Sequence, residues 1–360
     1  MKACTARSGL GPGQPGLGSF GAEEYGPGMY LWNDTWLAEH TEVALDAGRP
    51  IVDPHHHLWD HRDMGRYLLE DLHGDTGAGH NIEATVFVEC SWGYRTEGPE
   101  HLRPGGETER VAAVAAASTA SGGAEIRGIV SFADMTLGDA VDEVLDAHVA
   151  VGGGRFRGIR HATAFDPDRR IARAHTRPTA GLMADATFRK GVTRLGARGL
   201  SFDAWLYHPQ ISELADLARS VPGCTFVLDH LGGPLGIGPY EGHRAEMLEG
   251  WRRDIADAAT CPNIVVKLGG IGMVVYGLGY EHQPAPPSSE DLAAEWGGPV
   301  RFTIEQFGVE RCMFESNFPV DKQSCSYVTL WNSFKRMAVD ASATEKEALF
   351  RGTATRVYRL

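Results

Sequence analysis

The sequence predicts an α/β fold, a (β/α)8 TIM barrel with an N-terminal extension, and three observations support this prediction. Eight short apolar runs alternate with segments of helical period, which is typical of a parallel sheet covered by helices. The chain of 360 residues fits one large barrel. The first run is not followed by a GxGxxG loop, which argues against an open dinucleotide-binding sheet.

The chain is expected to divide into an N-terminal arm and cap segment, residues 1–49, and a barrel domain, residues 50–360. Residues 1 to about 28 are rich in Gly and Pro, which is typical of a flexible arm. The segment Met29–Ala47 carries Leu and Trp among acidic residues. We expect it to form a helix or a cap laid against the barrel.

The expected strands are Ile51–His57, Ala84–Cys90, Ile126–Phe132, Phe156–His161, Leu200–Tyr207, Thr225–Asp229, Asn263–Leu268 and Arg311–Phe314. Between them, segments such as 137–149 and 211–221 repeat apolar residues at helical spacing. Near the end of the chain, Ser342 and Glu345 have the spacing of a capping box, which predicts the start of the last helix.

Composition limits the classes of partner. A net charge of −13 argues against nucleic acid or an anionic membrane, since both require a basic surface, so a small-molecule substrate is expected. A homo-oligomer is compatible with this composition. The six cysteines lack CxxC spacing, and we see neither a secretory signal nor an apolar run of membrane-spanning length. We therefore expect a cytoplasmic protein without disulfides.

The strongest local signal is Asp53-Pro54-His55-His56-His57, at the end of the first strand. Alternation of side chains along a strand predicts that Asp53, His55 and His57 share one side. Two imidazoles at the carboxyl end of a barrel strand can bind a divalent cation or hydrogen-bond an oxygen of a substrate.

Other strand ends carry polar residues that would meet at the same rim of the barrel. The expected substrate-binding residues are Glu89, Trp92, Arg160, His161, Tyr207, His208 and Lys267. Arg160 and Lys267 would supply positive charge at the rim, which suits a carboxylate. Each residue alone is as compatible with a packing or ion-pair role. Their occurrence together favours a site, because buried ionisable groups are costly without a partner or a function.

Five segments in order, VDPHHHLWD, FRGIRHA, FVLDHLGGP, NIVVKLGGIG and RCMFESNFPVD, resemble the amidohydrolase superfamily. The similarity is to its amidohydrolase-2 branch, which includes 2-pyrone-4,6-dicarboxylate lactonase-like and sugar lactonase-like enzymes. The resemblance implies a TIM-barrel hydrolase in which His55 and His57 match the HxH pair and His230 matches the His of a later strand. It further implies that Arg160 faces a carboxylate or lactone. Some members of the branch use zinc, including decarboxylases, whereas the lactonase-like members work without metal.

The chain departs from that family at the last strand. The family pattern Gly-Ser-Asp ends in a general base, whereas this chain reads Glu315-Ser316-Asn317. A neutral amide does not take up a proton at ordinary pH. Alternation places Glu315 on the face of Asn317, so Glu315 would point into the barrel one layer deeper and replace the aspartate. The alternative is that Glu315 is a structural partner of Arg160, Lys267 or a histidine.

Two mechanisms follow. In the first, one divalent metal, zinc or manganese, binds His55, His57, His230 and Glu315 and lowers the pKa of a bound water. In the second, no metal is present, the histidines hydrogen-bond the substrate, and Glu315 or Glu89 activates water. The expected catalytic residues are His55, His57, His230, Glu315 and Asn317.

The function these expectations favour is hydrolysis of a lactone or similar cyclic ester of a small carboxylate-bearing substrate. A zinc-dependent non-oxidative decarboxylase of an aromatic acid is the first alternative. A barrel that binds a small ligand without catalysis is the second, and the missing aspartate is its best support.

Overall fold

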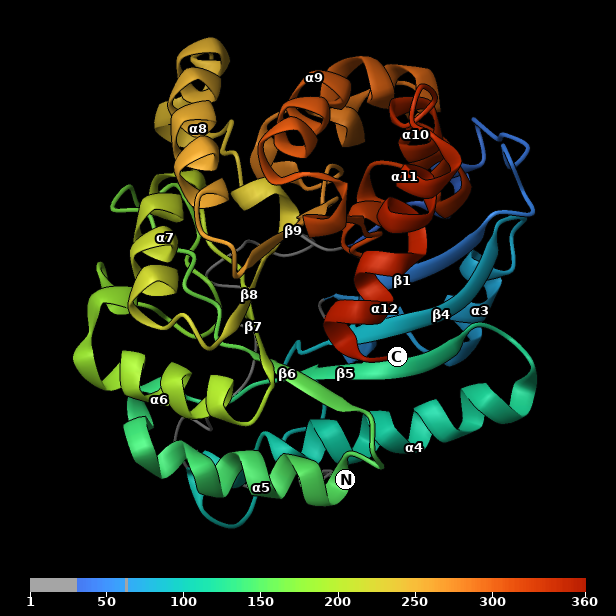
Figure 1. Cartoon of the computed structure of the whole chain (residues 1–360). Helices are drawn as coiled ribbons and strands as arrows, with labels where there is room; N and C mark the ends of the chain where they lie inside the picture. Colours follow the sequence, from blue (N-terminus) through green and yellow to red (C-terminus); the bar gives the residue numbers. More distant parts are fainter. Residues whose placement is uncertain (1–30, 62–63) are drawn as a thin grey trace, which may run out of the picture.

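The computed structural model describes residues 31–61 and 64–360. Eight parallel strands form one sheet in chain order, and each strand expected from the sequence is confirmed (Figure 1). They are β1 (Pro50–His56), β4 (Asn81–Val88), β5 (Glu125–Ser131), β6 (Phe156–Arg160), β7 (Ser201–Ala204), β8 (Thr225–Leu228), β9 (Ile264–Leu268) and β10 (Cys312–Phe314). A short antiparallel pair, β2 (Trp59–His61) and β3 (Gly65–Tyr67), follows β1.

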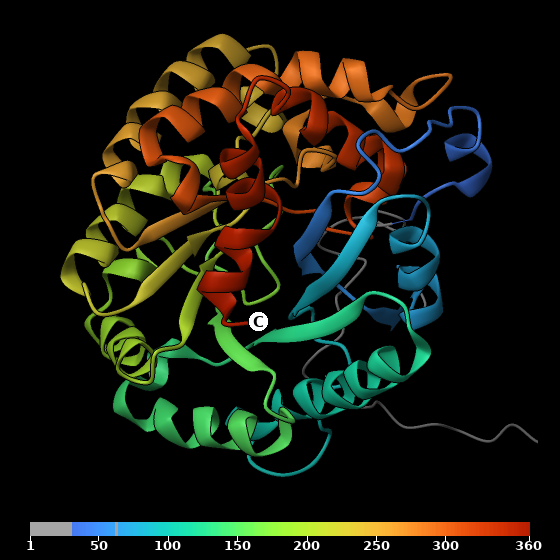
Figure 2. The same ribbon diagram turned by 45° about the vertical axis from the view of Figure 1, so that its right-hand side comes forward.

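The sheet curls round until the segment after β10 meets β1. The N–H of His57 donates to the carbonyl of Phe318 at 2.7 Å, and the N–H of Asn317 donates to the carbonyl of His55 at 2.9 Å. Figure 2 shows the strands arranged as a ring. The molecule is therefore a (β/α)8 barrel. The two ends of the sheet meet at His55, His57 and Asn317, which the sequence marked as candidate site residues.

Helices surround the ring of strands (Figures 1 and 2). The principal ones are α3 (Leu69–Thr76), α4 (Gly105–Ser121), α5 (Val141–Val151), α6 (Ala186–Ala197), α7 (Ile211–Ser220), α8 (Arg244–Ala259), α9 (Ser289–Phe307), α10 (Tyr327–Met337) and α11 (Ala343–Glu347). Helix α11 begins at the predicted capping box, in which Ser342 N–H donates to Glu345 Oε2 at 2.7 Å and Glu345 N–H donates to Ser342 Oγ at 3.3 Å.

The last helix, α12 (Thr353–Tyr358), closes one end of the barrel (Figure 2). Its residues Ala354, Val357 and Tyr358 pack with inward-facing strand residues such as Val227 and Met313 in one apolar cluster. Because this end is filled with apolar side chains, a ligand cavity can form only nearer the carboxyl ends of the strands, as is usual for barrels of this kind.

The N-terminal segment forms one short helix and otherwise contacts the rest of the chain through polar groups. In the described part of Met29–Ala47, the helix is limited to α2 (Asp34–Leu37). The rest is held by polar contacts: the Trp36 indole N–H donates to the carbonyl of Gln283 at 2.8 Å, and Glu42 accepts from Ser289 N–H at 2.7 Å. Residues 1–28, expected to be a flexible arm, lie outside the described residues, and the division at residue 50 stays a prediction.

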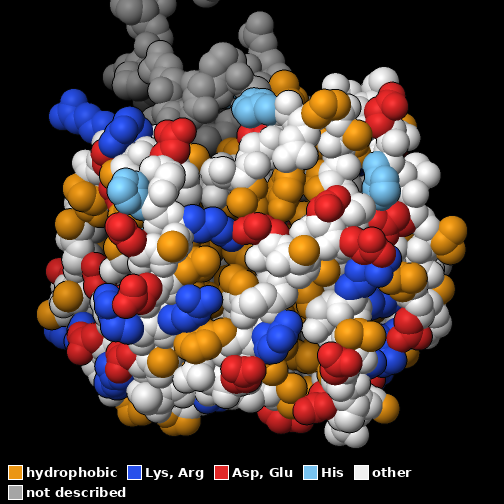
Figure 3. All heavy atoms as spheres, turned by 90° about the horizontal axis from the view of Figure 1, so that it is seen from above, with side chains coloured by type: hydrophobic (Ala, Val, Ile, Leu, Met, Phe, Trp, Pro, Cys, Tyr) orange, Lys and Arg blue, Asp and Glu red, His pale blue; other side chains and the backbone are white. Residues whose placement is uncertain are grey.

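The described residues bear on the expectations for membrane-spanning segments, surface charge and disulfides. Among them, no helix combines the length and the apolar character that a membrane crossing requires. In the face drawn in Figure 3, basic and acidic side chains are interspersed. The described cysteines, Cys90, Cys224, Cys261, Cys312 and Cys325, are buried free thiols. Cys4 lies outside the described residues.

Candidate active site

Alternation along the strands places polar side chains directly beyond the apolar layer at α12. Val265 and Met313 belong to the interior apolar cluster, and Lys267 and Glu315 follow two residues later on the same faces. Both polar side chains are completely buried. As expected, Glu315 therefore points into the barrel one layer below Asn317.

The prediction that Asp53 shares a side with His55 and His57 is wrong. Strand β1 has an extra residue relative to β4 between Asp53 and His56, and this β-bulge reverses the alternation. The Asp53 carboxylate accepts from the Tyr327 hydroxyl at 2.9 Å and from the Ser316 N–H at 2.9 Å. Asp53 thus fastens β1 to the end of β10 and to α10, while the bulge directs His55 inward.

Glu315 lies between two imidazoles. Its Oε1 is 2.6 Å from Nδ1 of His230, and its Oε2 is 2.7 Å from Nδ1 of His55. The backbone N–H of His230 also donates to Oε1, at 3.2 Å. Burial raises the pKa of Glu315 to about 8. When Glu315 is ionised, its Oε1 accepts from the Nδ1–H of His230, which leaves the lone pair on Nε2 of that ring.

His57 and His230 are neutral imidazoles. Burial lowers the pKa of His230 to about 3, and burial together with the charge of Arg160 holds the pKa of His57 well below 6.5. Nδ1–H of His57 donates to the carbonyl of Val88 at 2.8 Å, so its Nε2 also carries a lone pair. This Nε2 lies 3.2 Å from Nε2 of His55. Unprotonated imidazole nitrogens can accept a proton or bind a cation.

Lys267 does not lie at the rim where the sequence led us to expect it. Its Nζ is buried at 2.8 Å from Asp203 Oδ2, 3.0 Å from Asp229 Oδ1 and 3.2 Å from His55 Nδ1. Although burial lowers its pKa, the carboxylates of Asp203 and Asp229 raise it above 10.5, so the ammonium persists. With three partners inside the barrel, Lys267 supports His55 from below and is remote from any ligand in the cavity.

Arg160 is held by Glu89. Its Nε donates to Glu89 Oε1 at 2.8 Å, another guanidinium nitrogen donates to the Glu89 carbonyl, and NH1 lies 3.4 Å from His55 Nε2. The second carboxylate oxygen of Glu89 is 3.1 Å from Nε2 of His175. Burial opposes ionisation of Glu89, but the charges of His175 and Arg160 and their hydrogen bonds lower its pKa to about 2. Glu89 is therefore a buried anion that orients Arg160 and His175.

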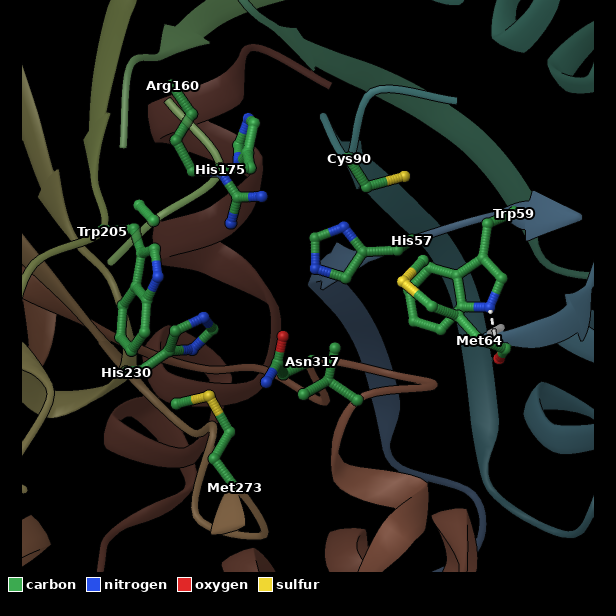
Figure 4. A pocket seen from close by; sticks show the side chains of 12 residues that line it. His57, Trp59, Met64, Cys90, Arg160, His175, Trp205, His230, Met273 and Asn317 are labelled. Carbon is green, nitrogen blue, oxygen red and sulfur yellow. Dashed lines mark hydrogen bonds between the residues drawn. The ribbon is translucent and has the colours of Figure 1, made fainter. Parts of the chain in front are cut away.

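These groups surround a cavity of about 100 Å³ at the carboxyl end of the barrel (Figure 4). Its polar lining consists of His57, Arg160, His175, His230 and Asn317, and its apolar lining of Trp59, Met64, Cys90, Ala174, Trp205, Met273 and Val320. Trp59 and Trp205 lie on opposite sides of the space (Figure 4). His55 and Glu315 lie beneath the cavity and are not part of its lining.

Asn317 occupies the position at which the sequence comparison expected a general base. Its backbone has φ +55°, and its Nδ2 donates to Asp321 Oδ1 at 2.8 Å. Gly272 N–H donates to the other oxygen of Asp321 at 2.8 Å, which fixes that carboxyl group. Figure 4 shows the amide oxygen of Asn317 directed into the cavity, where it can accept a hydrogen bond from water or a hydroxyl group.

Of the seven expected substrate-binding residues, only Arg160 lines the cavity. Besides Glu89 and Lys267, the other four satisfy backbone groups of the surrounding loops or take part in packing. His161 and His208 accept hydrogen bonds from the N–H groups of Met135 and Leu235 at 3.1 and 3.2 Å. The Tyr207 hydroxyl donates to a backbone carbonyl at 2.6 Å. Trp92 packs against the guanidinium of Arg110, 5.0 Å from its ring centre.

Several lining residues were missed from the sequence. Trp205 could have been found, because it follows Asp203 by two residues on the inner face of β7. His175, Met64 and Met273 come from loops whose path has no periodic pattern, so only the tertiary structure brings them to the cavity.

The donor set His55, Asp229 and His230 can hold a metal ion. One ligand atom from each lies within 4.8 Å of the others. Both carboxylate oxygens of Asp229 are buried and accept no hydrogen bond from the described residues, although Lys267 Nζ is 3.0 Å away. Such a nitrogen and oxygen set fits zinc or manganese. It differs from the set expected from the sequence, because Asp229 takes part and Glu315 is hydrogen-bonded to His230.

We expect protein purified without added metal to bind about one equivalent of zinc when titrated with it. Asp229→Asn keeps the shape but removes the charge, and should weaken zinc binding at least about tenfold. Elemental analysis after dialysis measures both. Asp216→Asn, at a side chain 66 % exposed on the surface, is the matched control. Equal zinc content in the Asp229 variant and the wild type would contradict the assignment.

Comparison with known proteins adds three findings. A family model described as Amidohydrolase matches residues 52–360. The uncharacterized protein y4mH of Sinorhizobium fredii is 32% identical over 331 residues, which cover 86% of this chain and 98% of that protein. An L-fucono-1,5-lactonase of Burkholderia multivorans is 24% identical over 324 residues, which cover 86% and 96%.

Solved structures share the fold. An amidohydrolase from Burkholderia multivorans, crystallised with bound zinc, superposes with a TM-score of 0.67 at 23% identity and covers 87% of this chain and 100% of that chain. Other structures with this fold include 5-carboxyvanillate decarboxylases, one of them complexed with manganese.

Proposed function

Since this chain belongs to the amidohydrolase family and is a hydrolase, we propose that it opens a lactone or similar cyclic ester of a small carboxylate-bearing substrate by attack of water. The observation that carries the proposal is the Glu315–His230 pair, whose ring faces the cavity beside the guanidinium of Arg160. The cavity thus offers a base that can activate water and, at another part of its wall, a cation that can bind the substrate's carboxylate.

His230 is the base that touches water. Its Nδ1–H is held by Glu315 at 2.6 Å, so its Nε2 takes the proton as the water oxygen attacks the carbonyl carbon. Glu315 does not reach the cavity and acts through His230, since its carboxylate, which forms as the pH rises through its pKa of about 8, stabilises the imidazolium. The amide oxygen of Asn317 accepts a hydrogen bond from the same water and orients it.

Arg160 binds the substrate anion. Its guanidinium lines the cavity and is oriented by two hydrogen bonds to Glu89, which leaves it restrained before the substrate arrives. Trp59 and Trp205 provide flat walls on opposite sides for a ring. A zinc or manganese ion held by His55, Asp229 and His230 would be the alternative to this base, because His230 could not then take up the proton. The ion would instead polarise a carbonyl oxygen and lower the pKa of a bound water.

The experiment is hydrolysis of paired lactones that differ by one carboxylate, followed by acid release at constant pH. The wild-type protein should open both and prefer the carboxylate-bearing lactone. In Arg160→Gln this preference should be lost, with kcat/KM for the charged lactone falling by at least about tenfold. Carbon dioxide release from aromatic acids, with no lactone opening, would favour the decarboxylase. Ligand binding without turnover of either class would favour the binding barrel.

A further inference from the structure

A second imidazole with its own carboxylate partner faces the same cavity. His175 comes from the long loop between β6 and α6 and lines the cavity, with its side chain 19 % exposed. Its Nε2 lies 3.1 Å from Oε2 of Glu89, which is completely buried. The site therefore has a second carboxylate–imidazole pair, in which the carboxylate meets Nε2 of the ring, whereas Glu315 meets Nδ1 of His230 at 2.6 Å. In Figure 4 His175 lies beside Arg160, at a different part of the wall from His230.

Other hydrogen bonds hold the loop on both sides of His175. The Ala174 N–H donates to the Ala164 carbonyl at 3.0 Å, and the Tyr207 hydroxyl donates to the Ala172 carbonyl at 2.6 Å. The Thr176 hydroxyl also donates to the carbonyl of Ala162. These bonds fasten the chain on both sides of His175, so its ring is brought to Glu89 by a loop that is already anchored.

We propose that His175 is a second proton-transfer residue of this site, the general acid that protonates the leaving ring oxygen, an inference that rests on the proposed lactone-opening function. The base that activates water receives a proton while the leaving oxygen requires one, and a second imidazole can supply it without waiting for the base to return its own. Two separate imidazoles permit both transfers within one cavity.

The atoms balance as follows. The water oxygen bonds to the carbonyl carbon and its proton passes to Nε2 of His230. When the tetrahedral intermediate collapses, the bond from carbon to the ring oxygen breaks, and its electron pair goes to that oxygen, which takes a proton from the His175 imidazolium. The product is a hydroxy acid. His230 then loses a proton to solvent and His175 regains one. The net reaction converts lactone and water into the hydroxy acid.

Glu89 supports the imidazolium form by remaining charged. Its pKa stays near about 2 despite complete burial, because His175 and Arg160 both face it. Its Oε1 is engaged by Arg160 and its Oε2 by His175, so one carboxylate orients the anion-binding group and the proton donor together. Arg160 and His175 are therefore placed to contact neighbouring parts of one substrate.

The test compares two lactones that differ in the basicity of the leaving oxygen. δ-Valerolactone releases an alkoxide, which needs protonation, whereas dihydrocoumarin releases a phenoxide, which needs it little. In His175→Gln we expect kcat/KM to fall by about 10²-fold or more for δ-valerolactone and by less than about tenfold for dihydrocoumarin. His243→Gln, an exposed surface histidine, is the matched control and should match the wild type for both.

Equal losses on the two lactones, or no loss on δ-valerolactone, would overturn the assignment and leave His175 as a packing residue. His175→Asn serves if the Gln variant fails to fold, as judged by circular dichroism. A wild-type protein that opens neither these two lactones nor the carboxylate-bearing lactone would overturn the proposed function itself. Failure of the proposed function can be distinguished from failure of the His175 assignment, because the wild-type protein alone reveals it.

Discussion

Replacing Glu315 by Gln is expected to lower kcat for lactone opening by about a hundredfold or more. The substitution preserves size and allows an oxygen to face His230 Nδ1, but it removes the carboxyl group that ionises as the pH rises through about 8 and then stabilises the imidazolium. It also removes the charge opposite His55, 2.7 Å away. Steady-state kinetics with the carboxylate-bearing lactone measure the loss, and circular dichroism shows that the barrel is intact.

The Asn317→Asp variant tests whether the carboxylate is needed at position 317 or at Glu315. If Glu315 acts through His230, a carboxylate at position 317 should add little activity. Glu246→Gln, at a side chain 82 % exposed, controls for loss of a glutamate charge. Should Asn317→Asp create activity while Glu315→Gln is tolerated, the chain is a family member whose base has been lost, and the ligand-binding barrel becomes the better proposal.

His230→Gln is expected to have the largest effect, a fall in kcat of about 10³-fold, since the variant loses the imidazole that takes the proton from the attacking water. Substrate binding by Arg160 should persist, so KM for the charged lactone should change little. His101→Gln, in a surface pair with Glu143, is the control. Activity within tenfold of the wild type would exclude His230 as the base.

The surroundings of His230 explain why a ring is required there. Its backbone has φ +55°, and the Tyr276 hydroxyl donates to its carbonyl at 3.0 Å. Gly270 packs so closely that a Cβ at that position would lie 2.6 Å from the ring. Backbone conformation and packing thus hold the imidazole at one orientation, with Nδ1 on Glu315 and the opposite edge toward the cavity.

Local sequence patterns determined the barrel and much of its inner face. Apolar runs with helical segments between them identified every strand of the ring, because burial on both faces leaves a continuous hydrophobic signal. Alternation alone placed Glu315 inside the barrel below Asn317. The HxH pair and Arg160 were identified as candidates because they end their strands, and the structure places His57 and Arg160 at the cavity.

What the tertiary structure decided depends on contacts between residues far apart in the chain. An extra residue in β1 turned Asp53 away from His55, and two carboxylates from neighbouring strands drew Lys267 into the interior. His175 reaches Glu89 only because an anchored loop returns over the barrel. Residue periodicity reports the face on which a side chain lies, whereas the partner it meets there depends on how distant segments pack, which no local pattern records.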